Sequence, residues 1–213
     1  MIKPIEELKK ENSLEEILDN SNPRVSRSDK KRIYDILESL KEEYEGGTII
    51  VLADEKDIDD YLKKGFYGPM DEDIFEGNPI SIYSPEFKEK LGESLQYDGA
   101  VIVSVKEDGT AAINSGMGLN VSPVGPECDF ASDLKFGARH RSTKKASYDM
   151  CEAIFYILSE EYRSIRMIER GDVIYSPVKE EMIDLKKQRQ EITELFDLKS
   201  EINYGLNNMG KAS

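Results

Sequence analysis

The stretch AVIVSVKEDGTAAIN, residues 100–114, decides which fold class we expect for this chain. Residues 100–105 form an apolar run rich in β-branched side chains, and residues 110–114 form a second, shorter run. The segment KEDG between the two runs has the composition of a tight turn. These three pieces together predict a β-hairpin.

Further elements are expected on both sides of the hairpin. Apolar or β-branched runs predict strands at residues 48–53, 80–83, 152–158, 164–169 and 172–176. Helical patterns lie at residues 53–65, 84–95 and 139–149. Strands and helices in this order predict an α/β fold, with a mixed central β-sheet flanked by helices.

We expect three regions along the chain: an N-terminal helical region (1–45), a central α/β domain (46–176) and a C-terminal helix and tail (177–213). In the first region, Ser28 and Asp29 resemble a helix start, and Gly46-Gly47 resembles a helix end. Residues 115–134 are rich in Gly, Pro and Ser and predict a long loop. Loops of this length inside a compact domain are more often functional than idle.

Composition excludes several classes of protein. The 213 residues carry a formal net charge of −14, which argues against general binding of nucleic acid. No apolar run is long enough to span a bilayer, and the first residues do not form a signal peptide. Cys128 and Cys151 are too few for a disulfide framework or a zinc site, so we expect free thiols in a reducing cytoplasm.

A basic segment stands out in this acidic chain. The sequence KFGARHRSTKK, residues 135–145, holds five Lys or Arg residues and no acid, whereas residues 53–98 hold 13 acidic and 5 basic residues. Arginine forks match phosphate oxygens, and free N–H groups at a helix start at Ala138 favour an anion. The alternative is a solvated basic patch that balances acidic neighbours. Charge alone leaves both interpretations open.

The only histidine of the chain, His140, lies between Arg139 and Arg141. Two neighbouring cations lower the pKa of an imidazole and keep it neutral, which leaves it available as a metal ligand or hydrogen-bond partner. Asp98, before one predicted strand, and Ser159-Glu160-Glu161, after another, supply carboxylates that can share a metal with an imidazole. The alternatives are an ordinary surface histidine and ordinary turn residues.

Taken together, DGA (98–100), RHR (139–141) and SEE (159–161) resemble the diadenylate cyclase domain. This domain forms the N-terminal part of the DNA-integrity scanning protein and occurs in membrane-bound and sporulation-type cyclases. The resemblance covers residues 48–176 and includes GMGL (116–119) and FGARHRS (136–142). DGA alone is a weak signal, but the three motifs in this order are specific.

The resemblance implies that two ATP molecules condense into cyclic di-AMP with release of two pyrophosphates, across a face-to-face homodimer. It implies catalytic roles for Asp98, Gly99, Arg139, His140 and Arg141. It implies ATP contacts from Gly99, Ala100, Met117, Leu119, Gly137, Ala138, Arg139, Arg141, Ser142, Ser159 and Glu160. It implies that Asp98, His140 and Glu161 hold a divalent Mn or Mg ion.

The chain departs from the family pattern at a few positions: Ala138 and Tyr162 stand where the family usually has Thr, and Gln96-Tyr97 precedes DGA. We therefore also consider a sensor of the same fold that binds nucleotide without turnover, and a scaffold whose acidic helical ends dock a partner. The cyclase needs metal and a dimer, possibly within a larger homo-oligomer. The sensor binds ATP without product, and the scaffold ignores ATP.

Overall fold

The computed structural model describes residues 13–66, 68–69, 80–95, 100–106, 111–117 and 138–177, without the side chains of residues 68–69, 94, 111–117 and 138–142. The chain divides into two compact units, residues 1–177 and 178–213. All elements described below belong to the first unit. The expected C-terminal helix and Cys128 lie outside the described residues.

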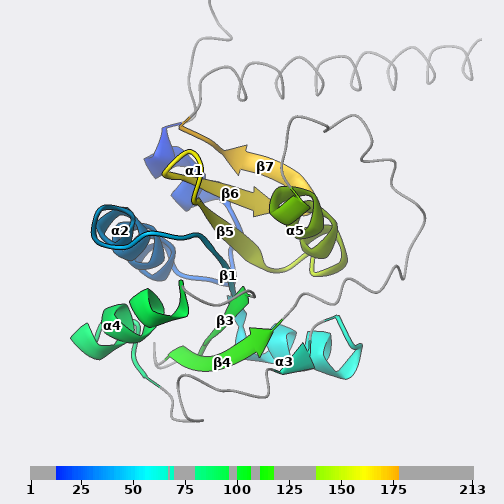
Figure 1. Ribbon diagram of the computed structural model, residues 1–213. Coiled ribbons are helices and arrows are strands. Elements are labelled where there is room, and N and C mark those ends of the chain that lie inside the picture. The colour runs from blue at the N-terminus through cyan, green and yellow to red at the C-terminus, as the bar shows by residue number, and fades with distance from the viewer. Residues whose placement is uncertain are drawn as a thin grey trace, which may run out of the picture. The chain divides into compact units, whose positions relative to one another are not determined.

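Within the described residues, seven strands form one sheet in the order β2-β4-β3-β1-β5-β6-β7 (Figure 1). They are β1 (Thr48–Asp54), β2 (Gly68–Pro69), β3 (Ala100–Val105), β4 (Ala111–Met117), β5 (Ile154–Ser159), β6 (Ser164–Glu169) and β7 (Asp172–Tyr175). Of the neighbouring pairs, β1 and β3 run parallel and the others antiparallel. The expected α/β fold with a mixed sheet is confirmed, and β3 and β4 form the expected hairpin.

Helices α1 (Leu14–Asn20), α2 (Arg27–Glu43) and α4 (Pro85–Ser94) share one hydrophobic core with the sheet. Alternate strand residues such as Ile50 and Leu52 point into this core, because successive side chains of a strand face opposite sides. The apolar residues Leu37 and Leu40 of α2 are fully buried in this core, at 0% exposure. The N-terminal helices are therefore part of the same core as the strands.

Helices α3 (Glu55–Lys63) and α5 (Ala138–Asp149) lie on the other side of the sheet from α2 and α4 (Figure 1). Helix α3 contacts β1 and β3, and its residues Ile58 and Tyr61 are buried. Helix α5 contacts β5, β6 and β7. None of the described helices is long and apolar enough to cross a membrane.

Three sequence expectations about local structure were wrong in detail. Helix α2 begins at Arg27, because Ser26 rather than Ser28 is its N-cap and accepts the Asp29 N–H at 3.1 Å. Residues 80–83 form a turn and not a strand, since Ser81 accepts the N–H of Ser84 on its carbonyl and that of Tyr83 on its hydroxyl. Residues 115–117, expected in a loop, continue β4.

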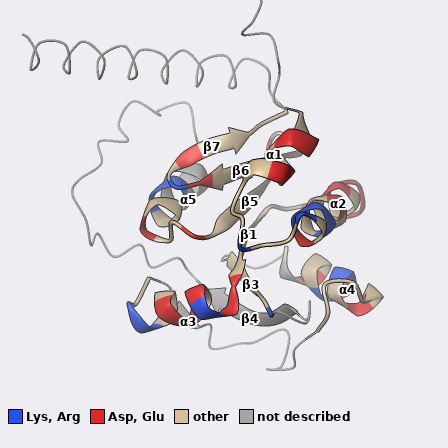
Figure 2. Cartoon of the chain, turned by 180° about the vertical axis from the view of Figure 1, so that it is seen from behind, with Lys and Arg blue, Asp and Glu red and all other residues tan. Residues whose placement is uncertain are grey.

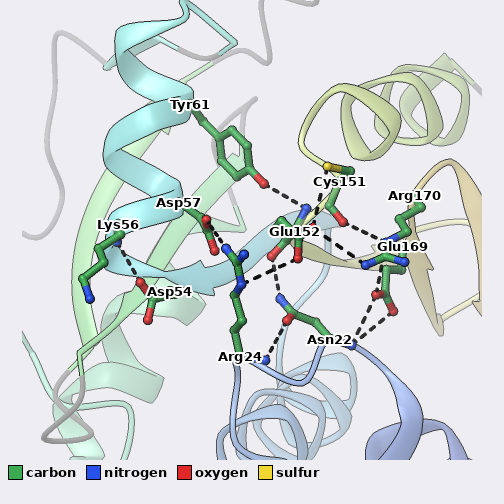
Figure 3. A network of polar contacts seen from close by, with 10 residues as sticks. All are labelled: Asn22, Arg24, Asp54, Lys56, Asp57, Tyr61, Cys151, Glu152, Glu169 and Arg170. Carbon is green, nitrogen blue, oxygen red and sulfur yellow. Dashed lines mark hydrogen bonds and ion pairs between the residues drawn. The ribbon is translucent and has the colours of Figure 1, made fainter.

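A polar network joins the α1–α2 connection to the start of β5 and the end of β6 (Figure 3). The Asn22 N–H donates to Glu169 Oε1 at 3.2 Å, and its side-chain amide donates to the Glu152 carbonyl at 2.5 Å. Arg24 Nη1 contacts Asp57 Oδ1 at 2.6 Å, which ties the same connection to α3. Cys151, beside this network, is an exposed free thiol, as expected.

Glu169 gives this network a pH dependence. Burial raises the pKa of Glu169 above its ordinary value of 4.5. The hydrogen bond from the Asn22 N–H and the positive charges of Arg170 and Lys30 lower this pKa, but burial has the larger effect. A carboxyl whose folded-state pKa is raised contributes stability below its ordinary pKa, and that contribution is lost as pH rises through the raised value. The wild-type protein should therefore lose stability across this window.

We expect Glu169→Gln to remove this decline, because the amide stays neutral and still offers an oxygen to Asn22. Thermal unfolding between about pH 4 and pH 7 measures the effect, and each unit of pKa difference contributes about 1.4 kcal/mol. Glu42→Gln, on the exposed side of α2, is the control and should follow the wild type. If the Tm of the wild type and that of Glu169→Gln changed with pH in parallel, the prediction would be contradicted.

Candidate functional site

One edge of the sheet gathers the strand ends next to the sequence motifs. Ala100, the first residue of β3, pairs with Gly116 near the end of β4 and with Ile49 near the start of β1. Thr48, next to Ile49, pairs with Leu158 near the end of β5. The start of β3 and the ends of β4 and β5 therefore share this edge.

The structure describes only some of the predicted site residues near this edge. Asp98, Gly99, Leu119 and Gly137 lie outside the described residues. Ala100 is buried at the start of β3, and Met117 ends β4 with its backbone described. Ser159 ends β5, and Glu160 and Glu161 follow it. The register thus brings Ala100 and Ser159 to the same edge, although residues 101–158 lie between them in the sequence.

Helix α5 carries Ala138, Arg139, His140, Arg141 and Ser142 in its first turns. Residues from its middle onward are buried against the rest of the unit: Thr143, Lys144, Ala146 and Ser147. The Ser147 hydroxyl donates to the Lys144 carbonyl and accepts the Gly171 N–H, both at 2.9 Å. Because α5 contacts β5, β6 and β7, its backbone at the RHR motif lies on the side of the sheet that α5 covers.

Residues 138–145 of the expected basic segment lie in α5, which begins at Ala138. In Figure 2, acidic residues mark α1, α3 carries acidic and basic residues, and basic residues lie on the part of α5 whose side chains are described. Positive charge at a helix N-terminus adds to the field of its free N–H groups and favours an anion.

The turn after β5 presents the two glutamates of the SEE motif. Ser159 is 7% exposed, and its Oγ accepts the Tyr162 N–H at 3.3 Å. Glu160 and Glu161 lie between these two residues and are both exposed. A hydroxyl that accepts one hydrogen bond keeps its own hydrogen to donate, so Ser159 can still bind an oxygen.

The candidate metal ligands are Asp98, His140 and Glu161. Glu161 is exposed, so its carboxylate oxygens are open to a ligand. Within the described ranges, no group of three His, Cys, Asp or Glu side chains could hold a metal ion. Asp98 and the His140 side chain lie outside these ranges. Two carboxylates and an imidazole form a donor set of the type that suits Mn²⁺.

The comparisons with known proteins decide the family. Residues 37–173, more than half of the chain, match the DAC family, described as "DisA bacterial checkpoint controller nucleotide-binding". This chain belongs to the DAC family. The predicted resemblance to diadenylate cyclases is thereby confirmed. Proteins of the DAC family are diadenylate cyclases of the nucleotidyltransferase type.

Solved structures similar to this chain include two bacterial proteins. A double mutant of DacA from Staphylococcus aureus is 21% identical, with a TM-score of 0.44, over 74% of this chain and 93% of that chain. A hypothetical membrane spanning protein from Bacillus cereus is 19% identical, with a TM-score of 0.43, over 69% of this chain and 62% of that chain. No curated protein matches the sequence.

Sequence reasoning missed three residues that hold the SEE turn of this DAC chain. Tyr162 was noted only as a departure from the family, while Arg163 and Arg166 were not singled out. Arg166 is 1% exposed and stands in β6 between the apolar residues Ile165 and Met167. That interruption, an arginine within SIRMIE, was the available signal, because fully buried arginines are rare unless paired.

Proposed function

We propose that this protein is a diadenylate cyclase, which condenses two ATP molecules into cyclic di-AMP and two pyrophosphates. The observation that carries the proposal is the DAC match over residues 37–173, which contains the DGA, RHR and SEE motifs in order. The common edge reached by β3, β4 and β5 supports it, since Ala100 of the DGA motif and Ser159 of the SEE motif both lie at that edge.

In the proposed reaction, the 3′-oxygen of each ATP attacks the α-phosphorus of the other. The bond from that phosphorus to the bridging oxygen breaks, and pyrophosphate leaves with the electron pair. Asp98 assists removal of the hydroxyl proton. Arg139 and Arg141 bind phosphate oxygens and offset the negative charge that develops during transfer.

The remaining predicted residues bind the nucleotide. Ser142 and Ser159 donate hydrogen bonds to phosphate oxygens, with the help of backbone groups at Gly99, Gly137 and Ala138. Leu119 supplies backbone contacts to the adenine, with Met117 nearby. Because each domain holds one ATP, the reaction requires two copies of this chain facing each other.

A divalent Mn or Mg ion fits this site through Asp98, His140 and Glu161. When bound, such an ion neutralises phosphate charge and makes the α-phosphorus a better electrophile. His140 can serve as a ligand only while neutral, and its two arginine neighbours favour that state. Glu160, next to Glu161, is proposed to contact the nucleotide.

The test is incubation of the purified full chain with ATP and Mn²⁺ or Mg²⁺, followed by mass spectrometry for cyclic di-AMP. The full chain is required, because removal of residues 1–45 would strip α1 and α2 from the core. Product confirms the cyclase. ATP binding without product in either metal would favour the sensor, and no ATP binding would overturn both.

We further expect Arg139→Ala and Arg141→Ala each to weaken ATP binding and to slow product formation. Hydrogen bonds to charged groups contribute about 1.5–3 kcal/mol, which corresponds to roughly a tenfold to hundredfold loss. Calorimetric titration with ATP and the rate of product formation measure the two effects. Lys145→Ala, which removes one charge from the same helix outside the motif, should retain both properties. Equal losses in all three variants would reduce the motif to a general basic patch.

A further inference from the structure

The turn that presents Glu160 and Glu161 is closed at both ends. Ser159 accepts the Tyr162 N–H at 3.3 Å, and Ser159 pairs with Ser164 across the β5–β6 ladder. Only four residues connect the two strands. The two glutamates are therefore the central residues of a short turn, and their direction depends on how firmly Ser159 and Tyr162 are held.

Tyr162 is held by a buried cation. The guanidinium carbon of Arg166 lies 5.5 Å from the centroid of the Tyr162 ring, in cation–π range. The Arg166 side chain is 1% exposed, and its Nη1 donates to Ser164 Oγ at 3.2 Å. An aromatic ring held on a cation withdrawn from water is restricted more firmly than one held by a mobile surface arginine.

Arg163 fixes the same turn from the other side. Its backbone has φ of 47°, in the left-handed region, so the chain reverses sharply before β6. Its Nη1 donates to the carbonyl of Tyr44 at 2.6 Å. Tyr44 is the C-cap of α2, so the turn is attached to a helix of the core.

We propose that Tyr162 and Arg166 are positioning residues of the nucleotide site, because their contact fixes the turn that presents Glu160 and Glu161. The proposal rests on the function proposed above, in which Glu161 is a ligand of the divalent ion and Glu160 contacts ATP. Tyr162 acts through the turn and touches neither ligand. Its ring, and not its hydroxyl, makes the contact with Arg166.

The experiment uses the full chain with Mn²⁺ and α,β-methylene ATP, an analogue that cannot release pyrophosphate. Calorimetry gives the Kd of Mn²⁺ for the wild type, Tyr162→Leu and Tyr162→Phe. We expect Tyr162→Leu to weaken Mn²⁺ binding about tenfold, in the range for residues that orient metal ligands. Tyr162→Phe keeps the ring over Arg166 and should bind like the wild type. With ATP, the Mn²⁺ concentration for half-maximal rate should shift in the same way.

The chain offers a matched control. Tyr83 is 49% exposed, and its ring lies 5.9 Å from the guanidinium carbon of Arg32, beside α2 and α4. Tyr83→Leu removes a similar tyrosine–arginine contact away from the SEE turn and should leave the Kd of Mn²⁺ unchanged. Tyr162 is 58% exposed, so its replacement should leave Tm within about 2 °C of the wild type.

Each outcome decides the proposal. Wild-type Mn²⁺ binding by Tyr162→Leu would overturn it, and a loss as large in Tyr162→Phe would overturn the role of the ring and Arg166. If the wild type binds both ligands but yields no cyclic di-AMP, the proposed reaction fails while the Mn²⁺ comparison still tests positioning. If the wild type binds no Mn²⁺, the positioning proposal falls, while product formation with Mg²⁺ still decides the proposed reaction.

Discussion

Replacement of Asp98 by asparagine is expected to abolish detectable cyclic di-AMP while ATP binding stays measurable. Asparagine has the size of aspartate but cannot take up the 3′-hydroxyl proton, and its neutral amide is a weaker ligand for a divalent ion. Loss of a positioned general base lowers the rate about 10²–10⁴-fold, and loss of a metal ligand adds to this. Affinity for ATP depends mainly on the arginines and should change little.

Two assays on the same samples measure these effects: product by mass spectrometry and ATP binding by calorimetry. Asp54→Asn is the matched control. Asp54 is the N-cap of α3, and it pairs with Val105 at the end of β3 opposite to Ala100. Asparagine caps helices as well as aspartate does, so this variant should fold and turn over normally. Product formation by Asp98→Asn at the wild-type rate would refute the assigned role.

Local patterns were sufficient for most elements of the fold. The β-branched run at residues 48–53, the helical pattern at residues 84–95 and the apolar run at residues 164–169 each predicted their element correctly. In these segments, periodicity and capping favour the same structure that packing favours. The turn at residues 80–83 shows the limit, because its two buried isoleucines alternate as in a strand while Ser81 satisfies the backbone locally.

Contacts between distant segments could not be predicted from the sequence. The placement of β1 between β3 and β5 gathers the candidate motifs at one edge, and no local signal specifies that register. Similarly, Arg163 meets the carbonyl of Tyr44 across 119 positions of sequence. The motifs predicted which residues to consider. The order of the strands in the sheet, which no motif predicts, places Ala100 of DGA and Ser159 of SEE at the same edge.

Gly46→Ala is expected to cause a large loss of stability, about 2–4 kcal/mol in the free energy of unfolding. Gly46 has φ of 116°, which side chains rarely adopt, so alanine would strain the backbone. A Cβ at this position would also lie 2.8 Å from the carbonyl oxygen of Leu95. That oxygen belongs to the backbone at the end of α4 and cannot rotate away as a side chain can.

Gly65→Ala separates the two causes. Gly65 has φ of 71°, and a Cβ there would meet nothing within 4 Å, so only the backbone cost of about 1–2 kcal/mol applies. Urea unfolding compares the two variants, and equal losses would refute the steric part of the argument. The Gly46–Leu95 approach lies just before the parallel strands β1 and β3, and Leu95 is three residues before Asp98. Movement of Leu95 in Gly46→Ala should therefore also lower cyclase activity, whereas Gly65→Ala should leave the activity of the folded protein unchanged.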